Sequence, residues 1–306
     1  MRIAIVDIGT NTTRLFVAEV ERDRVTRELY RESRVTRLGA GVDADGRLQD
    51  EAMARTHAVL AEYARVIEEG EAGRRVAVLT SAVRDAANGR EFAEACRRRY
   101  GLDIHVLSGD EEAQLTYLGA TDEVDPESRA RILVVDIGGG STELIIGSGR
   151  QAEFHVSTQA GVVRQGDRHV HQDPPAAAEL RAVADDVRAA LEAAVPEERR
   201  AGVERALAVA GTPTSLAAIA QELAPYDPER VQGYRLTAQT RDEIRERLGA
   251  MTLAERREVT GLHPDRALVI LPGIVILTVV MALFGLEAVE VSEHDILRGA
   301  ALRYGA

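Results

Sequence analysis

Two stretches of this chain share one pattern of hydrophobic and polar positions. Residues 3–15 read IAIVDIGTNTTRL and residues 132–144 read ILVVDIGGGSTEL, and they align without a gap at the offset from Asp7 to Asp136, which is 136 − 7 = 129 positions. Each copy is a β-rich apolar run, a turn rich in glycine and hydroxyl residues, and a second apolar run. The repeat predicts a β-hairpin at the start of each of two similar domains.

Predicted strands and helices alternate along the rest of the chain. In the first half, residues 50–69 and the segment GREFAEACRRRYG have helical periodicity, RRVAVL and IHVL predict strands, and DEEAQLTYLGAT predicts a helix. In the second half we expect a helix over 174–195, a strand and turn at ALAVAGTPTS, helices around 240–250 and a strand at AVEVS. This order predicts an α/β protein with domains 1–122 and 123–306, and the polar segment TDEVDPESRAR as the linker.

One apolar run is long enough to suggest a membrane span. Residues 267–286, ALVILPGIVILTVVMALFGL, contain Thr278 as the one clearly polar side chain. However, Pro272-Gly273 interrupts the run early, and the segment after it is acidic rather than basic. We therefore expect a fully buried helix of an α/β domain, and no membrane partner.

Composition limits the classes of partner. The 306 residues suit two hydrophobic cores, and the formal net charge of −12 argues against nucleic-acid binding. The chain has no lysine, so all 38 basic residues are arginine and a P-loop lysine is excluded. Cys96 is the one cysteine, and the chain starts directly with a strand-like run, so we expect a cytoplasmic protein in which Cys96 is structural.

The repeated turns suit a chain of phosphates. The first reads DIGTNTT and the second DIGGGST, and glycine lets backbone N–H groups approach phosphate oxygens closely while hydroxyls add donors. A single glycine-rich turn is weak evidence, but two copies after matching strands have no evident packing reason. The sequence therefore predicts two phosphate-binding turns that face each other across an interdomain cleft.

Several motifs together resemble one known family. The two DIG turns with AGTPTS resemble the actin, sugar kinase and Hsp70 superfamily, and SGDEEAQLTYLGA followed by VVDIGGGSTEL is similar to its exopolyphosphatase and guanosine pentaphosphate phosphatase members. TSAVRDAAN and the late LPG occur in that family's order. The resemblance covers nearly the whole chain and implies two ribonuclease H-like (actin-like ATPase) domains.

The resemblance also implies roles for individual residues. It implies that Glu112 is the general base that orients water, and that Arg84 binds the terminal phosphate. It makes Asp136 and Glu143 ligands of Mg²⁺, or of Mn²⁺, and Asp7 is the equivalent position in the first domain. The remaining phosphate donors would come from the two turns: Asn11, Thr12, Gly138, Gly139, Gly140 and Ser141.

Several functions stay open at this level. The short form favours an exopolyphosphatase, with guanosine pentaphosphate as the second possible substrate. The sequence is also compatible with an ATP-dependent kinase of the same superfamily or with a nucleotide sensor without turnover, and a homodimer is consistent with the family. The family's C-terminal Leu-Arg-Glu-Gly pattern lacks its glutamate here, at Leu297-Arg298-Gly299. Three histidines, His155, His169 and His171, are expected to be exposed or structural, because nothing nearby completes a zinc site.

Overall fold

Both predicted hairpins are present in the structure, a computed structural model that describes residues 1–22 and 24–305. Strands β1 (Arg2–Ile8) and β2 (Thr12–Glu21) pair antiparallel, as do β6 (Arg131–Ile137) and β7 (Thr142–Ser148). The turns close in the same way: Gly9 N–H donates to the Thr12 carbonyl at 2.9 Å, and Gly138 N–H donates to that of Ser141 at 3.0 Å. The sequence repeat is therefore also a structural repeat.

The chain forms two units, of which unit 1 comprises residues 1–123 and 294–306. Its five-stranded sheet has the order β3-β2-β1-β4-β5, in which β1, β4 and β5 run parallel. The other strands of unit 1 are β3 (Arg24–Val35), β4 (Arg74–Leu79) and β5 (Asp103–Val106). Its helices are α1 (Val42–Asp45), α2 (Asp50–Glu69), α3 (Ser81–Asp85), α4 (Gly89–Tyr100), α5 (Gly109–Ala120) and α14 (Ile296–Tyr304).

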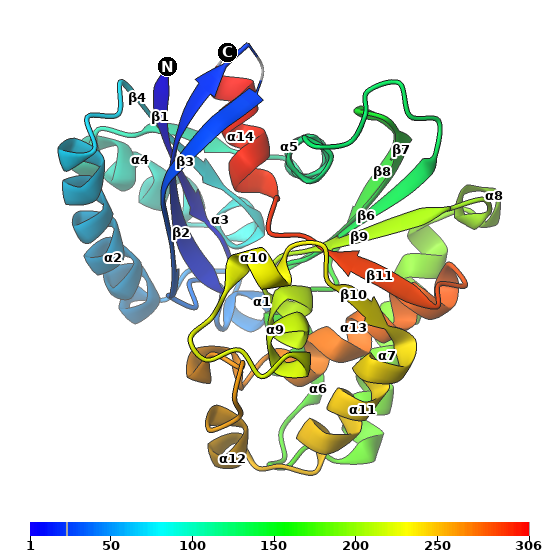
Figure 1. The fold of residues 1–306 in the computed structure, drawn as a ribbon. Helices are drawn as coiled ribbons and strands as arrows, with labels where there is room; N and C mark the ends of the chain where they lie inside the picture. The colour runs from blue at the N-terminus through cyan, green and yellow to red at the C-terminus, as the bar shows by residue number, and fades with distance from the viewer. Residues whose placement is uncertain (23, 306) are drawn as a thin grey trace. The chain divides into compact units, whose positions relative to one another are not determined.

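Alternation along β1 assigns helices to the two faces of this sheet. Ala4 and Val6 belong to the core that contains residues of α2 and α4, whereas Ile3 and Ile5 belong to the core that contains residues of α5 and α14. Figure 1 shows α2 and α4 on one side of the strands and α5 and α14 on the other. Successive strand side chains point to opposite faces, so an unbroken apolar run suits a strand covered on both sides.

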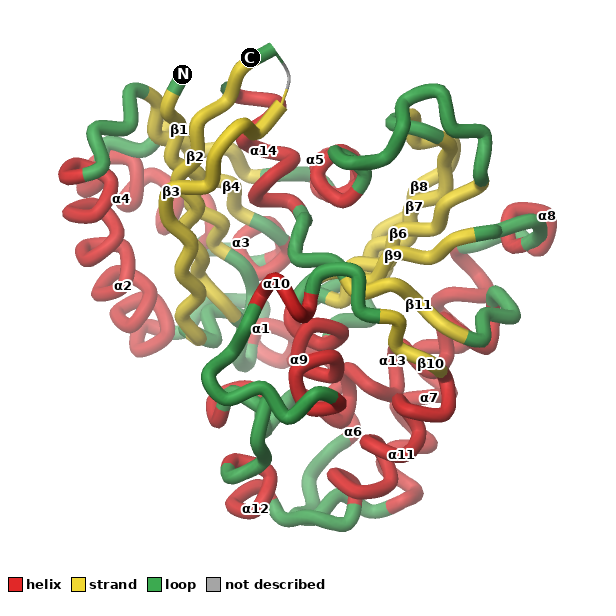
Figure 2. Tube along the Cα trace, viewed as in Figure 1, coloured by secondary structure: helices red, strands yellow, loops and turns green. Residues whose placement is uncertain are grey.

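Unit 2, residues 124–293, has a six-stranded sheet of order β10-β11-β9-β6-β7-β8. Without the short edge strand β10 this is the strand order of unit 1, and Figure 2 shows helices and sheet together in each unit. The other strands are β8 (Gln151–Thr158), β9 (Arg205–Val209), β10 (Arg235–Thr237) and β11 (Ala288–Val291). The helices are α6 (Val162–His169), α7 (Ala177–Ala194), α8 (Glu197–Arg200), α9 (Gly211–Ala220), α10 (Pro228–Val231), α11 (Ala238–Gly249), α12 (Leu253–Arg257), the 3₁₀ turn η1 (Pro264–Arg266) and α13 (Ile270–Leu283).

The long apolar run forms the central helix of unit 2. Helix α13 is 14 residues long, and 11 of them are buried, so the prediction of a buried helix is confirmed. Its neighbours in the core include Val183, Val187 and Leu191 of α7. Within the described residues, no helix is long and apolar enough to cross a membrane.

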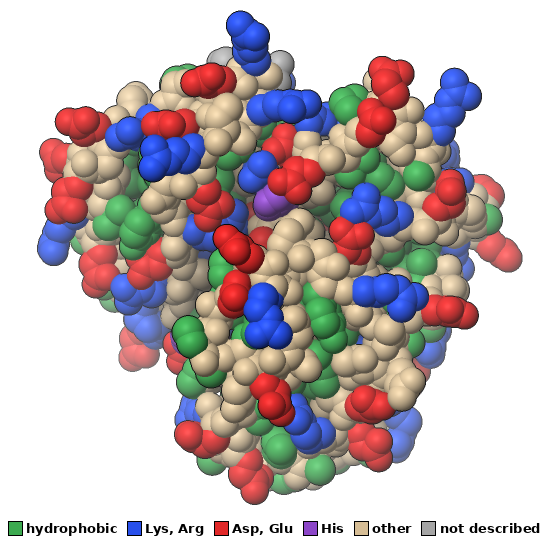
Figure 3. Space-filling view, in the orientation of Figure 1, with side chains coloured by type: hydrophobic (Ala, Val, Ile, Leu, Met, Phe, Trp, Pro, Cys, Tyr) green, Lys and Arg blue, Asp and Glu red, His purple; other side chains and the backbone are tan. Residues whose placement is uncertain are grey.

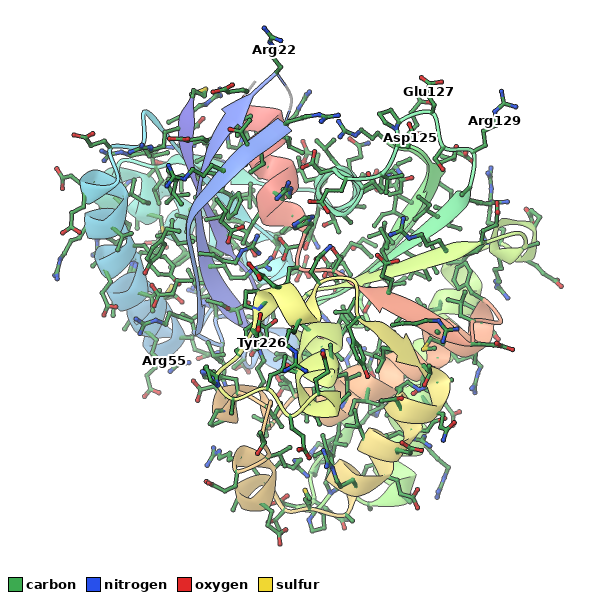
Figure 4. All side chains as sticks on the ribbon, viewed as in Figure 1. Arg22, Arg55, Asp125, Glu127, Arg129 and Tyr226 are labelled. Carbon is green, nitrogen blue, oxygen red and sulfur yellow. The ribbon has the colours of Figure 1, made fainter. Side chains whose placement is uncertain are left out.

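The C-terminal helix belongs to unit 1, although the predicted boundary at residue 122 placed it in the second domain. Residues 294–306 belong to unit 1, where Ile296, Leu297 and Ala300 of α14 pack against strand residues such as Ile5 and Phe16. Residues 124–130 do form the polar loop before β6, and Figure 4 shows Asp125, Glu127 and Arg129 projecting from it. The chain thus crosses between the units twice, after Glu123 and after Glu293.

Candidate active site

In the first hairpin a carboxylate faces an arginine. Asp7 and Arg14 are direct cross-strand partners, and Asp7 Oδ2 accepts hydrogen bonds from Arg14 Nε at 2.9 Å and Nη2 at 2.6 Å. Arg14 Nη1 also pairs with Asp295, which accepts from Leu297 N–H as the N-cap of α14. The Arg14 guanidinium therefore forms ion pairs with two buried carboxylates. The local sequence does not predict the pairing with Asp295.

Burial and charge act in opposite directions on these two carboxyls. Burial raises the pKa of Asp7, against the pull of Arg14. For Asp295 burial also acts upward, but Arg14, Arg31 and the Leu297 N–H outweigh it and lower the pKa. The second oxygen of Asp7, Oδ1, is buried and has no hydrogen-bond partner among the described residues.

In the second hairpin the same register brings two carboxylates together. Asp136 faces Glu143 across β6 and β7, at the positions equivalent to Asp7 and Arg14. Glu143 is 1% exposed and Asp136 7% exposed, and Ser157 Oγ donates to Glu143 Oε1 at 2.7 Å. Like charges directly opposite each other on a sheet destabilise it unless a counter-charge is present. Because Mg²⁺ is commonly held by one or two carboxylates together with waters and phosphates, this pair fits the predicted metal.

In the turn of the second hairpin, backbone carbonyls bond to the protein while three backbone N–H groups point the other way. Its three carbonyls are taken up: Gly138 O accepts from Val162 N–H at 2.9 Å, Gly139 O from Val163 N–H at 2.8 Å, and Gly140 O from Arg164 Nε at 3.0 Å. In a trans peptide the next N–H points opposite to the carbonyl. The three N–H groups concerned have no acceptor within the described part of the chain: those of Gly139, Gly140 and Ser141.

A glycine permits this arrangement. A Cβ atom on Gly161, just before α6, would lie 2.3 Å from the carbonyl oxygen of Gly139. The first hairpin is anchored in a similar manner, because Asn11 O accepts from Thr36 N–H at 3.0 Å and Arg37 N–H at 2.9 Å. Three backbone donors on one side of a turn form a concave site for an anion.

The acidic start of α5 separates into a capping residue and a buried acid. Ser108 and Glu111 form a capping box, and the Ser108 backbone and hydroxyl bonds lower the pKa of Glu111. Glu112 is instead 8% exposed, and its Oε2 accepts from Arg84 Nη1 at 2.9 Å. Arg84 Nη1 also donates to the Leu107 carbonyl at 3.0 Å. The predicted base and the predicted phosphate-binding arginine are therefore in direct contact.

Two of the histidines that the sequence singled out lie beside single acidic residues. His169 Nε2 lies 3.5 Å from Asp186 Oδ2, and His171 N–H donates to Glu179 at 2.9 Å. Across residues 1–22 and 24–305 no group of three or more His, Cys, Asp or Glu side chains is placed to hold a metal ion. On the face seen in Figure 3, acidic and basic side chains are interspersed.

The AGTPTS segment holds a contact that the sequence did not predict. It begins α9 rather than forming an isolated turn, and Arg266 Nη1 donates to Gly211 O at 3.1 Å and to Ser215 Oγ at 3.2 Å. Fifty-one residues separate Ser215 from Arg266. No local periodicity could have paired them.

Comparison with known proteins shows the family to which this chain belongs. The model of the Ppx/GppA phosphatase family matches residues 16–303, and the chain belongs to that family. Exopolyphosphatase 2 of Mycobacterium tuberculosis is 37% identical over 316 residues, covering 98% of each chain. The crystal structure of the Aquifex aeolicus Ppx/GppA family member is 31% identical with a TM-score of 0.82, covering 100% of this chain and 97% of that one. That of an exopolyphosphatase from Cytophaga hutchinsonii is 27% identical with a TM-score of 0.89, covering 100% and 99%.

These likenesses confirm the predicted family and the two-domain actin-like α/β fold. The roles assigned to individual residues stay predictions, as do the cleft between the domains and the homodimer. The structure brings the candidates together in two sets. Glu112 and Arg84 are in contact in unit 1, and Asp136 and Glu143 lie beside the glycine turn in unit 2.

Proposed function

We propose that this protein is an exopolyphosphatase, which hydrolyses the terminal phosphoanhydride bond of inorganic polyphosphate and releases orthophosphate. The relatives named exopolyphosphatase support this substrate. The observation that carries the mechanism is the contact of buried Glu112 with the partly exposed Arg84, in which Arg84 Nη1 lies 2.9 Å from Glu112 Oε2. A carboxylate that neither caps its helix nor faces solvent, held against a phosphate-binding type of side chain, suits hydrolysis.

Each member of the pair has a distinct task in this proposal. Arg84 has five N–H donors in a planar fork, so it can bind phosphate oxygens while it keeps its bond to Glu112. Glu112 accepts a hydrogen bond from the attacking water and takes its proton as the new P–O bond forms. The bond to the departing phosphate chain breaks, and the terminal phosphate leaves as orthophosphate.

The second unit supplies charge balance. We propose that Asp136 and Glu143 hold Mg²⁺, with Mn²⁺ as a substitute, which neutralises phosphate charge when it is bound. Asp7 stays a predicted ligand through Oδ1, since Arg14 already occupies its other oxygen. The N–H groups of Gly139, Gly140 and Ser141 are proposed to bind phosphate oxygens, and Asn11 and Thr12 to act similarly in the first turn.

The decisive experiment measures orthophosphate release from polyphosphates of defined length, with Mg²⁺ or EDTA. Glu112→Gln is compared with Glu111→Gln, which changes the neighbouring acid without touching Arg84. We expect metal-dependent release, a loss of about a hundredfold or more in kcat for Glu112→Gln, and little change for Glu111→Gln. Equal activity of wild type and Glu112→Gln would exclude this mechanism.

Guanosine pentaphosphate is the second candidate substrate because it shares the terminal phosphoanhydride chemistry. The same assay with this nucleotide gives the ratio of the two kcat/KM values and so identifies the preferred substrate. A kinase is less well supported, because a buried water-orienting carboxylate serves hydrolysis. Transfer of phosphate to an added acceptor, in place of orthophosphate release, would favour the kinase.

A further inference from the structure

Helix α5 is fixed at both of its ends by polar groups. At its N-terminus, beside Glu112, the capping box of Ser108 and Glu111 satisfies the first backbone donors. Just after its C-terminus, Arg298 Nε donates to Asp122 Oδ2 at 2.7 Å. The second contact joins positions 176 residues apart and ties α5 to α14.

The helices α5 and α14 also touch through their backbones, and they lie side by side in Figure 1. A Cβ atom on Gly119 would lie 1.9 Å from the carbonyl oxygen of Asp295, and one on Gly299 would lie 1.8 Å from that of Leu115. Because the two backbones are so close, a small shift of α5 along α14 changes which groups meet at this contact. The ion pair lies beside this contact.

The ion pair is shielded from solvent. The Asp122 side chain is 4% exposed and that of Arg298 is 11% exposed. Arg298 Nη1 also donates to His294 Nε2 at 3.4 Å, and Glu123 lies 3.9 Å from both Arg298 and His294. A buried charge that loses its partner is strongly destabilising, so neither Asp122 nor Arg298 is easily displaced from the other.

We propose that Arg298 is a positioning residue for hydrolysis: by holding Asp122 it fixes the axial position of α5, and thereby the position of Glu112 against Arg84. This inference rests on the proposed role of Glu112. Glu112 lies eight positions before Ala120, the last residue of α5, which is about 12 Å of helix at 1.5 Å per residue, and Asp122 follows two positions later. A short helix moves as a rigid rod, so displacement at one end reaches the other. A misplacement of about 1 Å of a group at the reacting atoms can reduce the rate about a hundredfold.

The test compares Arg298→Gln and Asp122→Asn with Leu60→Ala. Leu60 is buried in α2 on the opposite face of the sheet, so its variant is destabilised without a change at α5. We expect kcat for orthophosphate release from polyphosphate to fall about tenfold or more in both ion-pair variants, with KM within twofold. Leu60→Ala, assayed where it is fully folded, keeps its kcat.

Three further measurements separate positioning from stability alone. Arg298→Lys, which keeps the charge, should recover part of the lost kcat. The double variant Asp122→Asn/Arg298→Gln should lose no more than either single variant, because both remove one contact. Amide hydrogen exchange in α5 should quicken in Arg298→Gln but not in Leu60→Ala, and this readout needs no activity.

The outcomes distinguish the inference from the proposed function. If Glu112→Gln is inactive while the Arg298 and Asp122 variants keep the kcat of Leu60→Ala, only the positioning role is wrong. If Glu112→Gln keeps full activity, the assignment of Glu112 is wrong and the inference fails with it. Unchanged exchange of α5 in a folded Arg298→Gln protein would also overturn the inference.

Discussion

Replacing Gly299 with alanine sets two opposing effects against each other. Gly299 lies inside α14, and alanine is favoured over glycine in a helix interior by about 1 kcal/mol. If only helix propensity mattered, Gly299→Ala would therefore stabilise the protein. The contact with α5 predicts the opposite.

The steric term is larger than the gain in propensity. A Cβ atom on Gly299 would lie 1.8 Å from the Leu115 carbonyl oxygen and 2.7 Å from its carbon, and both atoms belong to the backbone of α5. A backbone in a packed helix cannot turn aside as a side chain does. Overpacking of this kind costs about 1–3 kcal/mol or more, so we expect a net destabilisation of up to about 2 kcal/mol.

Thermal unfolding checks this magnitude. A domain of about 150 residues shifts in melting temperature by about 4 °C per kcal/mol, so Gly299→Ala should melt several degrees below wild type. The matched control is Gly249→Ala at the end of α11, where a Cβ atom would have nothing within 4 Å. That variant should be as stable as wild type or more stable, by up to about 1 kcal/mol.

The two variants together test the reasoning. Gly299→Ala with an unchanged or higher melting temperature would show that α5 and α14 are not in backbone contact. If Gly249→Ala also melted several degrees below wild type, the destabilisation of Gly299→Ala could not be attributed to the contact with α5. If unfolding proceeds in two steps, the step that belongs to unit 1 is the one to compare.

Three further predictions concern the metal pair, pH and the cysteine. Glu143→Arg should fold, because the first hairpin accommodates arginine at the equivalent position, and it should lose Mn²⁺ binding measured by calorimetry; an affinity within twofold of wild type would contradict the metal assignment. Burial lowers the pKa of His294, and the charges of Arg298 and Arg31 act in the same direction against Glu123 and Asp122. At a pH below about 6.5 the unfolded chain therefore binds more protons at this residue than the folded protein does. Stability to urea should therefore fall as pH decreases from 7.5 to 5.5, less steeply in His294→Gln, and equal slopes would refute this. Burial raises the pKa of Cys96 to about 12, so its thiol should react with a disulfide reagent only after unfolding, and rapid labelling of native protein would show otherwise.

The sequence predicted those parts of the fold that depend on local pattern. The two hairpins, the strands before α3 and α5, and the buried helix α13 follow from runs of apolar residues and from glycine turns. The third strand of each sheet was not predicted. Strand β3 reads RVTRELYRESRV, and it is an edge strand whose charged side chains hide the alternation.

Contacts between residues far apart in the chain could not be predicted from local sequence patterns. The pairing of Arg14 with Asp295 joins residues 281 positions apart, and the packing of α14 on unit 1 depends on the same folded arrangement. Periodicity shows that α14 has an apolar face but not which core that face enters. The motif resemblance proposed Glu112 over Glu111, and the structure adds why they differ: one caps the helix and the other meets Arg84.

One difference between the repeated hairpins reverses the charge opposite the aspartate: Arg14 in the first is Glu143 in the second. In both, an aspartate ends the first strand and faces one residue of the second, so the backbone offers the same site twice. With Arg14 opposite, the charge of Asp7 is balanced within the protein. With Glu143 opposite, two negative charges add to those of a polyanionic substrate on a chain whose net charge is already −12. The Mg²⁺ proposed at Asp136 and Glu143 would offset part of this negative charge, which the first hairpin offsets with Arg14.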